Sequence, residues 1–276
     1  MTAERASTDL LEKWLRRPRP SDDKYSRGVL GVETGSRAYP GAALLGILGA
    51  LRTGIGMVRY SGPPSVGSLV IASHPEVVLT QGHVDAIVVG SGLGSPVSQR
   101  ARARVLYAFS RGVPTVVDAG ALDCAEETPS PSILTPHSRE LARLHHRVLG
   151  HEVSDDLEAA LMLARNLKTT ILVKGSVTHV VTADGHHSQL PVATPWLATA
   201  GTGDVLAGIL GALLASWSEH LRSTPGDCAE IAVAGALLHA LAAQSASTAR
   251  SGGPITATDV AEQVAVVVGE TLEATT

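Results

Sequence analysis

The chain has 276 residues, of which 44% are hydrophobic and 17% are charged, and its formal net charge is −4. This length and apolar content suit one large α/β domain or two small ones, and we expect a single domain over residues 1–276 with residues 1–22 as an N-terminal extension. Aromatic residues make up only 3% of the chain, and basic side chains are not in surplus. The composition therefore argues against nucleic acid and against anionic membrane surfaces as partners.

The two cysteines, Cys124 and Cys228, lie far apart and lack metal-ligand spacing, which predicts free thiols in a reducing compartment. The first 23 residues mix acidic and basic side chains without an apolar core, and the longest apolar stretch, residues 196–217, is interrupted by Asp204 and several glycines. We therefore expect a cytoplasmic protein without a membrane span.

The predicted elements alternate between buried strands and helices. A short first helix, capped by Ser7 or Thr8 and ended by Pro18, is interpreted as an outer addition to the fold. The expected strands cover residues 27–33, 57–60, 85–89, 113–117, 132–135 and 169–173, and a hairpin starts at 179–182. The expected helices cover residues 41–52, 96–110, a segment that begins at Pro136, 205–217, 229–247 and 258–272. Apolar strands without period-two alternation indicate an α/β fold with a mainly parallel sheet covered by helices on both faces.

Unusual residues follow the ends of these strands. They are Gly35 with Ser36, the glycine loop at residues 90–94, Asp118, His137, and Lys174 with Gly175. Ligands of open α/β sheets bind at the carboxyl ends of the strands. The sequence therefore predicts that these groups line one site.

The run ATAGTGDVLAGIL at residues 198–210 is the most informative motif. Gly201 and Gly203 let the backbone approach a ligand, and a helix from about Val205 would direct free N–H groups and its positive dipole end at this turn. Such a site accepts an anion, and Asp204 beside it supplies the carboxylate that orients the attacking hydroxyl in phosphoryl transfer. The alternative is that Asp204 only caps the helix. We expect the helix dipole to lower the pKa of Asp204.

Four further groups have both a functional and a structural interpretation. Lys174, followed by small and polar residues, suits a phosphate, and the loop at residues 90–94 suits either a ligand or a tight turn. His137 and Glu140 are three residues apart, so they either address one ligand or hydrated Mg²⁺ or form a helix cap. Asp118 either binds a ribose or water or caps the next turn. His239, within an apolar helix, is interpreted as a core or interface histidine and is left out of the catalytic set.

Taken in order, these motifs resemble the ADP-dependent (S)-NAD(P)H-hydrate dehydratases, whose fold is ribokinase-like. The resemblance covers residues 23–272, and its matching runs are residues 24–28, 35–36, 39–43, 50–56, 90–94, 117–122, 134–137 with Glu140, 173–175 with Thr178, and 198–208. It implies a three-layer sandwich and the repair of NADH or NADPH that has gained water on its nicotinamide ring. ADP would phosphorylate the ring hydroxyl, phosphate would be eliminated, and AMP would remain.

The resemblance also implies roles for individual residues. Asp204 would accept the hydroxyl proton, and the amides from Gly201 to Gly203 would stabilise the moving phosphoryl group. The remaining assignments are Ala42 or Ala43, Gly92 or Gly94, and His137 for the hydrated cofactor; Lys174, Gly175, Ser176, Val177, Thr178 and Gly203 for the AMP portion; and Glu140 for indirect contact with Mg²⁺.

Two segments depart from the family pattern. Ser91 stands where the family usually has proline, and residues 193–197 lack the Asn-Pro-Gly-Met sequence that the family usually has there. These differences leave open the loop shape over the nicotinamide, and whether Trp196 packs on the ligand or on a neighbouring subunit. The family's epimerase domain is not recognised in the chain, so we expect action on the S epimer alone, with a separate epimerase as functional partner.

Two other functions are compatible with parts of this pattern. A small-molecule kinase of the same fold, such as a hydroxyethylthiazole or sugar kinase, would share the anion site and Asp204. A catalytically silent nucleotide-binding regulator is disfavoured by Asp204 and Lys174. We expect a homo-oligomer, with a tetramer as the candidate form, because the alanine-rich segment at residues 229–243 suits either a subunit contact or the core.

Overall fold

The computed structural model describes residues 3–274, with eight strands in one sheet of order β2-β1-β3-β4-β5-β6-β7-β8. The strands are β1 (Val29–Glu33), β2 (Met57–Tyr60), β3 (Ala86–Val89), β4 (Thr115–Val117), β5 (Ser132–Leu134), β6 (Thr170–Val173), β7 (His179–Val181) and β8 (His187–Gln189). Strands β1 to β6 pair in parallel, and β7 and β8 add an antiparallel hairpin at one edge. The prediction of a mainly parallel sheet is confirmed.

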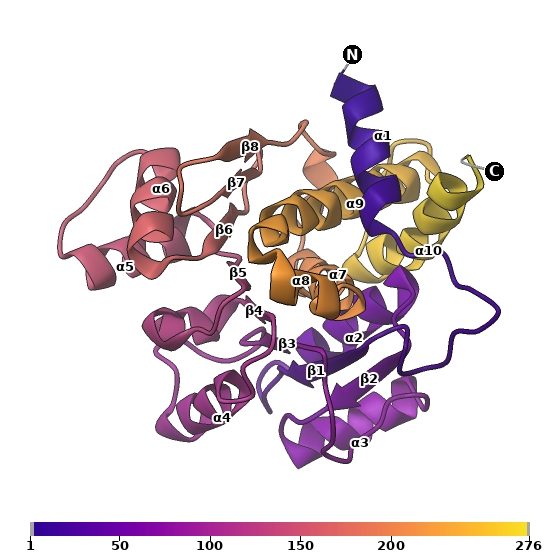
Figure 1. Cartoon of the computed structure of the whole chain (residues 1–276), viewed down its shortest axis with the longest axis horizontal. Coiled ribbons are helices and arrows are strands. Elements are labelled where there is room, and N and C mark those ends of the chain that lie inside the picture. Colours follow the sequence, from indigo (N-terminus) through magenta and orange to yellow (C-terminus); the bar gives the residue numbers. More distant parts are fainter. Residues whose placement is uncertain (1–2, 275–276) are drawn as a thin grey trace.

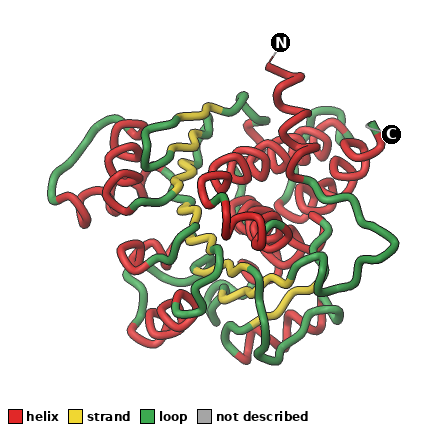
Figure 2. Tube along the Cα trace, viewed as in Figure 1, coloured by secondary structure: helices red, strands yellow, loops and turns green. Residues whose placement is uncertain are grey.

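Helices cover both faces of this sheet, which runs as one twisted band through the molecule (Figures 1 and 2). The helices are α1 (Ala3–Trp14), α2 (Gly41–Thr53), α3 (Pro64–Ser73), α4 (Gln99–Phe109), α5 (Ser138–Leu149), α6 (Asp156–Leu167), α7 (Thr202–Ser216), α8 (Ser218–Ser223), α9 (Cys228–Thr248) and α10 (Ala257–Glu273), with 3-10 turns η1 (Ala119–Glu127), η2 (Pro195–Leu197) and η3 (Pro225–Asp227). One apolar core lies beneath α1, α2, α7, α9 and α10, and a second lies beneath α4, α5, α6 and η1. Within β3, Val88 belongs to the first core and Ile87 and Val89 to the second, which explains the uninterrupted apolar strands.

Glycines set the packing distance between α2 and α7, the pair at the centre of the first core. A Cβ built on Gly208 would lie 1.9 Å from the carbonyl oxygen of Gly46, and one built on Gly49 would lie 2.6 Å from the carbonyl oxygen of Val205. Only glycine permits this approach. The start of α7 is therefore held firmly against α2.

The expectations for α1 are wrong in two respects. The helix begins at Ala3 rather than after Ser7 or Thr8, and its inner face is buried, with Leu11 and Trp14 each 1% exposed. The Trp14 indole packs edge-on against Trp217 at 5.4 Å and donates a hydrogen bond to Glu230 at 3.1 Å. The apolar side chains along one face of α1 close the core over α9, so the helix is part of the fold.

Other elements differ from the prediction at their ends or were not predicted. Helix α7 begins at Thr202, three residues before the expected Val205, because Gly201 adopts φ +93° and starts the helix there. Helix α4 begins after its cap residue Ser98 rather than at Pro96. Helices α3 and α6 were missed, although Asp155 caps α6 and its sequence signal is present.

Helix α9 is a core element. The segment Pro225–Thr248 is long and apolar enough to cross a membrane, but 67% of its most apolar window is buried within the structure. Side chains such as Ala232 and Leu238 are fully buried. Of the two interpretations of residues 229–243, the structure therefore favours the core.

Candidate active site

Hydrogen bonds join the loops at the carboxyl ends of neighbouring strands. The amide of Gly35 donates to Ser91 at 2.7 Å, that of Asp118 to Val89 at 3.0 Å, and that of Lys174 to Pro136 at 2.9 Å. The groups that the sequence placed after separate strands are thus brought to one edge of the sheet, as predicted.

Asp118 is the centre of a buried polar network at this edge. Its carboxylate is 2% exposed and accepts hydrogen bonds from the hydroxyl groups of Ser91 and Thr135, each at 2.8 Å, and from Lys174 Nζ at 2.6 Å. Burial alone would raise its pKa, but the Lys174 charge and these donors lower it. Asp118 makes no side-chain cap bond, so the capping interpretation is wrong, and its carboxylate instead forms an ion pair with Lys174. Binding of a ribose or water by Asp118 stays a prediction. Ser91, noted as a family departure, is one of its donors.

The start of α7 offers an unfilled set of donors. Within residues 3–274, the backbone amides of Gly201, Thr202 and Gly203 donate no hydrogen bond, whereas the next two amides both donate to the carbonyl of Gly201. The Thr202 hydroxyl fixes the preceding loop by donating to the carbonyl of Leu197 at 3.0 Å. Successive free amides at a helix start are suited to bind an anion.

Asp204 lies one residue beyond these amides and is half-buried. Among the described residues, no group donates a hydrogen bond to its carboxylate. Burial and the nearby Asp118 carboxylate raise its pKa to about 7, although Lys174 acts in the opposite direction. The expectation that the helix dipole makes Asp204 more acidic is therefore wrong, because desolvation and a like charge outweigh it.

A cavity of ≈640 Å³ opens between this helix start and the hairpin. Six of the predicted residues line it: His137, Lys174, Gly175, Ser176, Thr178 and Gly203. Apolar side chains of residues 190–197 and of α7 and α9 supply the remaining wall. Val177, Gly201 and Asp204 do not line it, although Gly203, the neighbour of Asp204 in the chain, does.

His137 and Glu140 form the capping box of α5. Nδ1 of His137 accepts from the amide of Glu140 at 3.3 Å, and Glu140 Oε2 accepts from the amide of His137 at 3.0 Å. The structural alternative for this pair is thus realised. His137 still lines the cavity, and Glu140 Oε2 lies 4.0 Å from Lys174 Nζ.

Of the residues predicted to contact the hydrated cofactor, His137 lines the ≈640 Å³ cavity, whereas Ala42, Ala43, Gly92 and Gly94 do not. Gly92, with φ +71°, packs so closely that a Cβ would lie 2.7 Å from that of Ala42. Ala43 is completely buried, which leaves Ala42 as the candidate of that pair. Gly94 lines a separate cavity of ≈610 Å³.

Two residues near the site have environments that the sequence did not reveal. His239 lines the ≈640 Å³ cavity, is buried, and has no hydrogen-bond partner at Nε2, and burial lowers its pKa to about 4. Trp196 donates from Nε1 to the carbonyl of Gly252 at 2.8 Å and does not line the cavity. The indole nitrogen is thus bonded within the chain, while the ring is 45% exposed, so packing of Trp196 on a ligand or on a neighbouring subunit stays a prediction.

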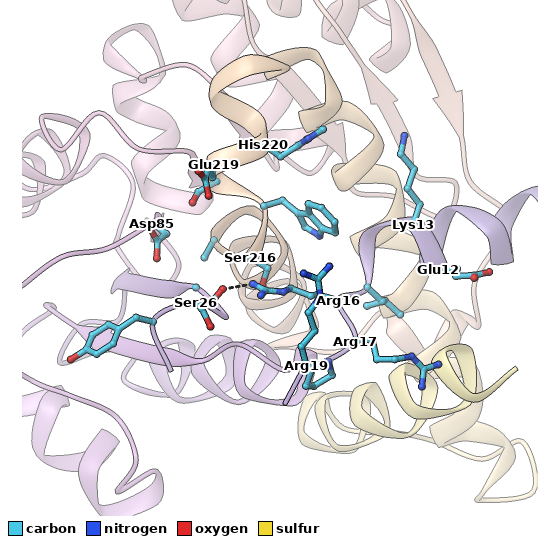
Figure 3. A pocket seen from close by; sticks show the side chains of 17 residues that line it. Glu12, Lys13, Arg16, Arg17, Arg19, Ser26, Asp85, Ser216, Glu219 and His220 are labelled. Carbon is cyan, nitrogen blue, oxygen red and sulfur yellow. Dashed lines mark hydrogen bonds between the residues drawn. The ribbon is translucent and has the colours of Figure 1, made fainter. Parts of the chain in front are cut away.

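The most spacious described cavity, ≈900 Å³, is not a candidate active site. It includes Gly28 and Asp85, which precede β1 and β3, so it lies at the opposite edge from the strand ends. Figure 3 shows Arg16 directed toward Ser26 in this cavity, and Arg16 also pairs with Asp22 at 2.8 Å. Arg16 thus ties the end of α1 to the segment that leads into β1.

The chain was compared with known proteins. A model of the NAD(P)H-hydrate dehydratase family matches residues 30–265. The Bifunctional NAD(P)H-hydrate repair enzyme Nnr of Mycobacterium tuberculosis is 40% identical over 222 residues, covering 76% of this chain and 45% of Nnr. The enzyme of the same name from Corynebacterium glutamicum is 34% identical over 279 residues, covering 90% of this chain and 48% of that one. The chain thus spans about half the length of the curated relatives it matches.

Solved structures agree in fold. The ADP/ATP-dependent NAD(P)H-hydrate dehydratase from Bacillus subtilis, co-crystallized with ATP/Mg²⁺, superposes with a TM-score of 0.81 at 26% identity, covering 96% of this chain and 97% of that one. A hydroxyethylthiazole kinase from Pyrococcus horikoshii superposes with a TM-score of 0.67 at 16% identity, covering 98% and 96%, which shows the shared ribokinase-like fold alone. On the extent of the family match and the identity to Nnr, this chain belongs to the NAD(P)H-hydrate dehydratase family.

Proposed function

We propose that the chain dehydrates the S epimer of hydrated NADH or NADPH at the expense of ADP, and so acts as a hydro-lyase that restores the reduced cofactor. The β-phosphoryl group passes to the ring hydroxyl, its bond to AMP breaks, and phosphate then leaves as the ring double bond forms. Hydroxide is a poor leaving group at neutral pH and phosphate is a good one. Phosphorylation by ADP therefore converts the ring hydroxyl into a group that can leave. The observation that carries the proposal is Asp204, a carboxylate without a hydrogen-bond donor beside the free amides that start α7.

Asp204 is the proposed general base. Its pKa of about 7 is close to the pH of the cell, so about half of the Asp204 carboxyl groups are ionised there. A general base works best in this range, because the basic form is present and still has a high affinity for the proton. It accepts the proton of the ring hydroxyl as that oxygen attacks phosphorus. The amides from Gly201 to Gly203 stabilise the charge on the phosphoryl oxygens during transfer.

The ≈640 Å³ cavity is the proposed site for the AMP portion. Its apolar wall suits the adenine base, and the sugar and phosphates would face Lys174, Gly175, Ser176, Thr178 and Gly203, which line the cavity. Val177 of the same run stays a proposed contact, although it does not line the cavity. Lys174 is held by Asp118, so its ammonium group is already oriented before the nucleotide arrives. His137, at the rim, and Ala42, Gly92 and Gly94 are the proposed contacts for the hydrated cofactor.

The residues fit an ion that is carried by the nucleotide. Within residues 3–274, no cluster of three or more His, Cys, Asp or Glu side chains is placed to hold a metal. Mg²⁺ typically keeps several waters and binds through substrate phosphates and one or two carboxylates. Glu140, close to Lys174, would contact it through water, and the ion would neutralise charge on the phosphates.

Several broader expectations belong to the same proposal. The whole chain acts as one domain in the cytoplasm, assembles into a homo-oligomer, and depends on a separate epimerase for the R epimer. Gel filtration with light scattering tests the assembly.

The deciding experiment is recovery of absorbance at 340 nm from hydrated NADH and hydrated NADPH, with ADP, with ATP and without nucleotide. We expect recovery with a nucleotide and none without it. Phosphorylation of a hydroxyethylthiazole or a sugar without recovery at 340 nm would identify a kinase instead. Tight ADP binding without any turnover would identify a nucleotide-binding regulator.

A further inference from the structure

The ≈610 Å³ cavity at the glycine loop has a composition of its own. It lies at the starts of α3 and α4, and among the described residues that line it the charged ones are all arginines: Arg37, Arg100 and Arg104. Leu93 and three prolines, at positions 63, 64 and 96, supply flat apolar surface beside them. This volume is within the range of sites for small ligands.

The three arginines are not equivalent. Arg104 Nε donates to the buried carboxylate of Glu33 at 2.7 Å, so its charge is compensated from inside the protein. Arg37 and Arg100 are exposed, and neither forms a hydrogen bond or ion pair with any described residue. The cavity therefore carries two guanidinium groups whose charge the described residues do not neutralise.

Such a lining selects a phosphate attached to a nucleoside. A phosphate monoester has nearly two negative charges and three strong acceptor oxygens, and arginine binds it with two parallel hydrogen bonds. The starts of α3 and α4 add partial positive charge. The prolines and Leu93 offer a surface for a purine base. A carboxylate or a sugar alone would use only part of this surface.

The glycine loop links this cavity to the residues proposed to contact the hydrated cofactor. Gly94 lines it, Gly92 of the same loop packs on Ala42, and the loop is joined to Gly35 by the hydrogen bond from the Gly35 amide to Ser91. A dinucleotide whose nicotinamide ring lies at Asp204 can thus extend along the glycine loop toward the arginines.

We propose that this cavity binds the adenosine 2′-phosphate end of hydrated NADPH, so that Arg37 and Arg100 make the chain prefer hydrated NADPH to hydrated NADH. This inference rests on the proposed function for its substrate, but its binding test does not require turnover.

The kinetic test compares kcat/KM for the two hydrates in the wild type and in Arg37→Ala, Arg100→Ala and the double variant. Hydrogen bonds to charged groups are stronger than those between neutral groups, so we expect a wild-type preference of about tenfold or more for hydrated NADPH, with the double variant losing most of it. Arg143→Ala, an exposed arginine of α5 that does not line the cavity, is the matched control and should keep the wild-type ratio. Equal kcat/KM for both hydrates in the wild type, or a ratio unchanged in the double variant, would overturn the proposal.

The binding test uses calorimetry with NADP⁺ and NAD⁺, which need no reaction. We expect NADP⁺ to bind more tightly than NAD⁺ in the wild type and in Arg143→Ala, but not in the double variant. If no hydrate is turned over and this pattern still holds, the proposed function fails while the site stands. If turnover is seen but NADP⁺ and NAD⁺ bind alike, the function stands and the site fails.

Discussion

The Lys174 ammonium group lies 2.6 Å from the Asp118 carboxylate, and this ion pair links the loops that follow β6 and β4. Burial disfavours the Lys174 charge, but Asp118 and then Glu140 raise the pKa of this lysine, which stays cationic. A Cβ on Gly203 would lie 3.6 Å from Nζ, so the ammonium group is adjacent to the free amides of α7. The pair therefore supplies fixed charges of both signs next to Asp204.

Asp118→Asn should move the pH dependence of the reaction. The Asp118 carboxylate raises the pKa of Asp204 and Lys174 lowers it. Removal of the Asp118 charge takes away the first effect and leaves Lys174 free to favour ionised Asp204. We expect the acidic limb of the kcat/KM profile to shift to lower pH than the wild-type limb near pH 7, as measured by the 340 nm assay. An unchanged or alkaline-shifted limb would contradict this coupling.

Asp204→Asn should abolish most of the turnover. The asparagine has nearly the same size and cannot accept the hydroxyl proton, so we expect kcat to fall by at least about 10²-fold while ADP still binds. In the wild type, kcat/KM should fall as the pH drops below about 7, because protonated Asp204 is inactive as a base. The variant should lack this limb. Calorimetry with ADP and the 340 nm assay provide the two measurements, and near-normal turnover would rule out the role.

Much of this site follows from sequence order, because residues after parallel strands must meet at one edge of the sheet. That rule correctly grouped Asp118, His137 and Lys174. It could not assign partners, since Asp118 and Lys174 are 56 positions apart and their pairing depends on β4, β5 and β6 being neighbours. The pKa of Asp204 was misjudged for the same reason: the local dipole is visible in sequence, whereas burial and Asp118 are set by tertiary structure.

The fold shows the same difference between features that the local sequence determines and features that depend on tertiary structure. Strand positions were predicted well because runs of buried β-branched residues are distinctive. The role of α1 was not predicted correctly, because one apolar face on a short helix does not reveal which surface of the protein the helix covers. The apolar surroundings of His239 in the sequence indicate a core residue, and only the structure shows that this histidine also lines the ≈640 Å³ cavity.

Asp204→Asn should also change stability in a pH-dependent way. The pKa of Asp204 is about 7 in the folded chain and near 3.8 when unfolded, so ionisation of this group disfavours the folded state. The wild type should lose unfolding free energy relative to the variant from about pH 4, with the difference complete above about pH 7. Because the group is only half-buried, we expect roughly 1–3 kcal/mol rather than the full value of the shift. Urea unfolding at pH 4, 6 and 8 measures it, and a difference that does not grow with pH would contradict the raised pKa.

Gly208→Ala should disturb both stability and catalysis. The new methyl group would lie 1.9 Å from the Gly46 carbonyl oxygen, so α2 and α7 would have to separate and the start of α7 would move. Overpacking of this kind typically lowers the free energy of unfolding by about 1–3 kcal/mol, and a small displacement of Asp204 would also lower kcat.

Gly269→Ala is the matched control, since Gly269 lies in α10 with nothing within 4 Å of its Cβ position. That change should stabilise the chain by about 0.5–1 kcal/mol through helix propensity and leave kcat unaltered, as urea unfolding and the 340 nm assay would show. Equal effects of the two substitutions would mean that the contact between α2 and α7 does not position Asp204.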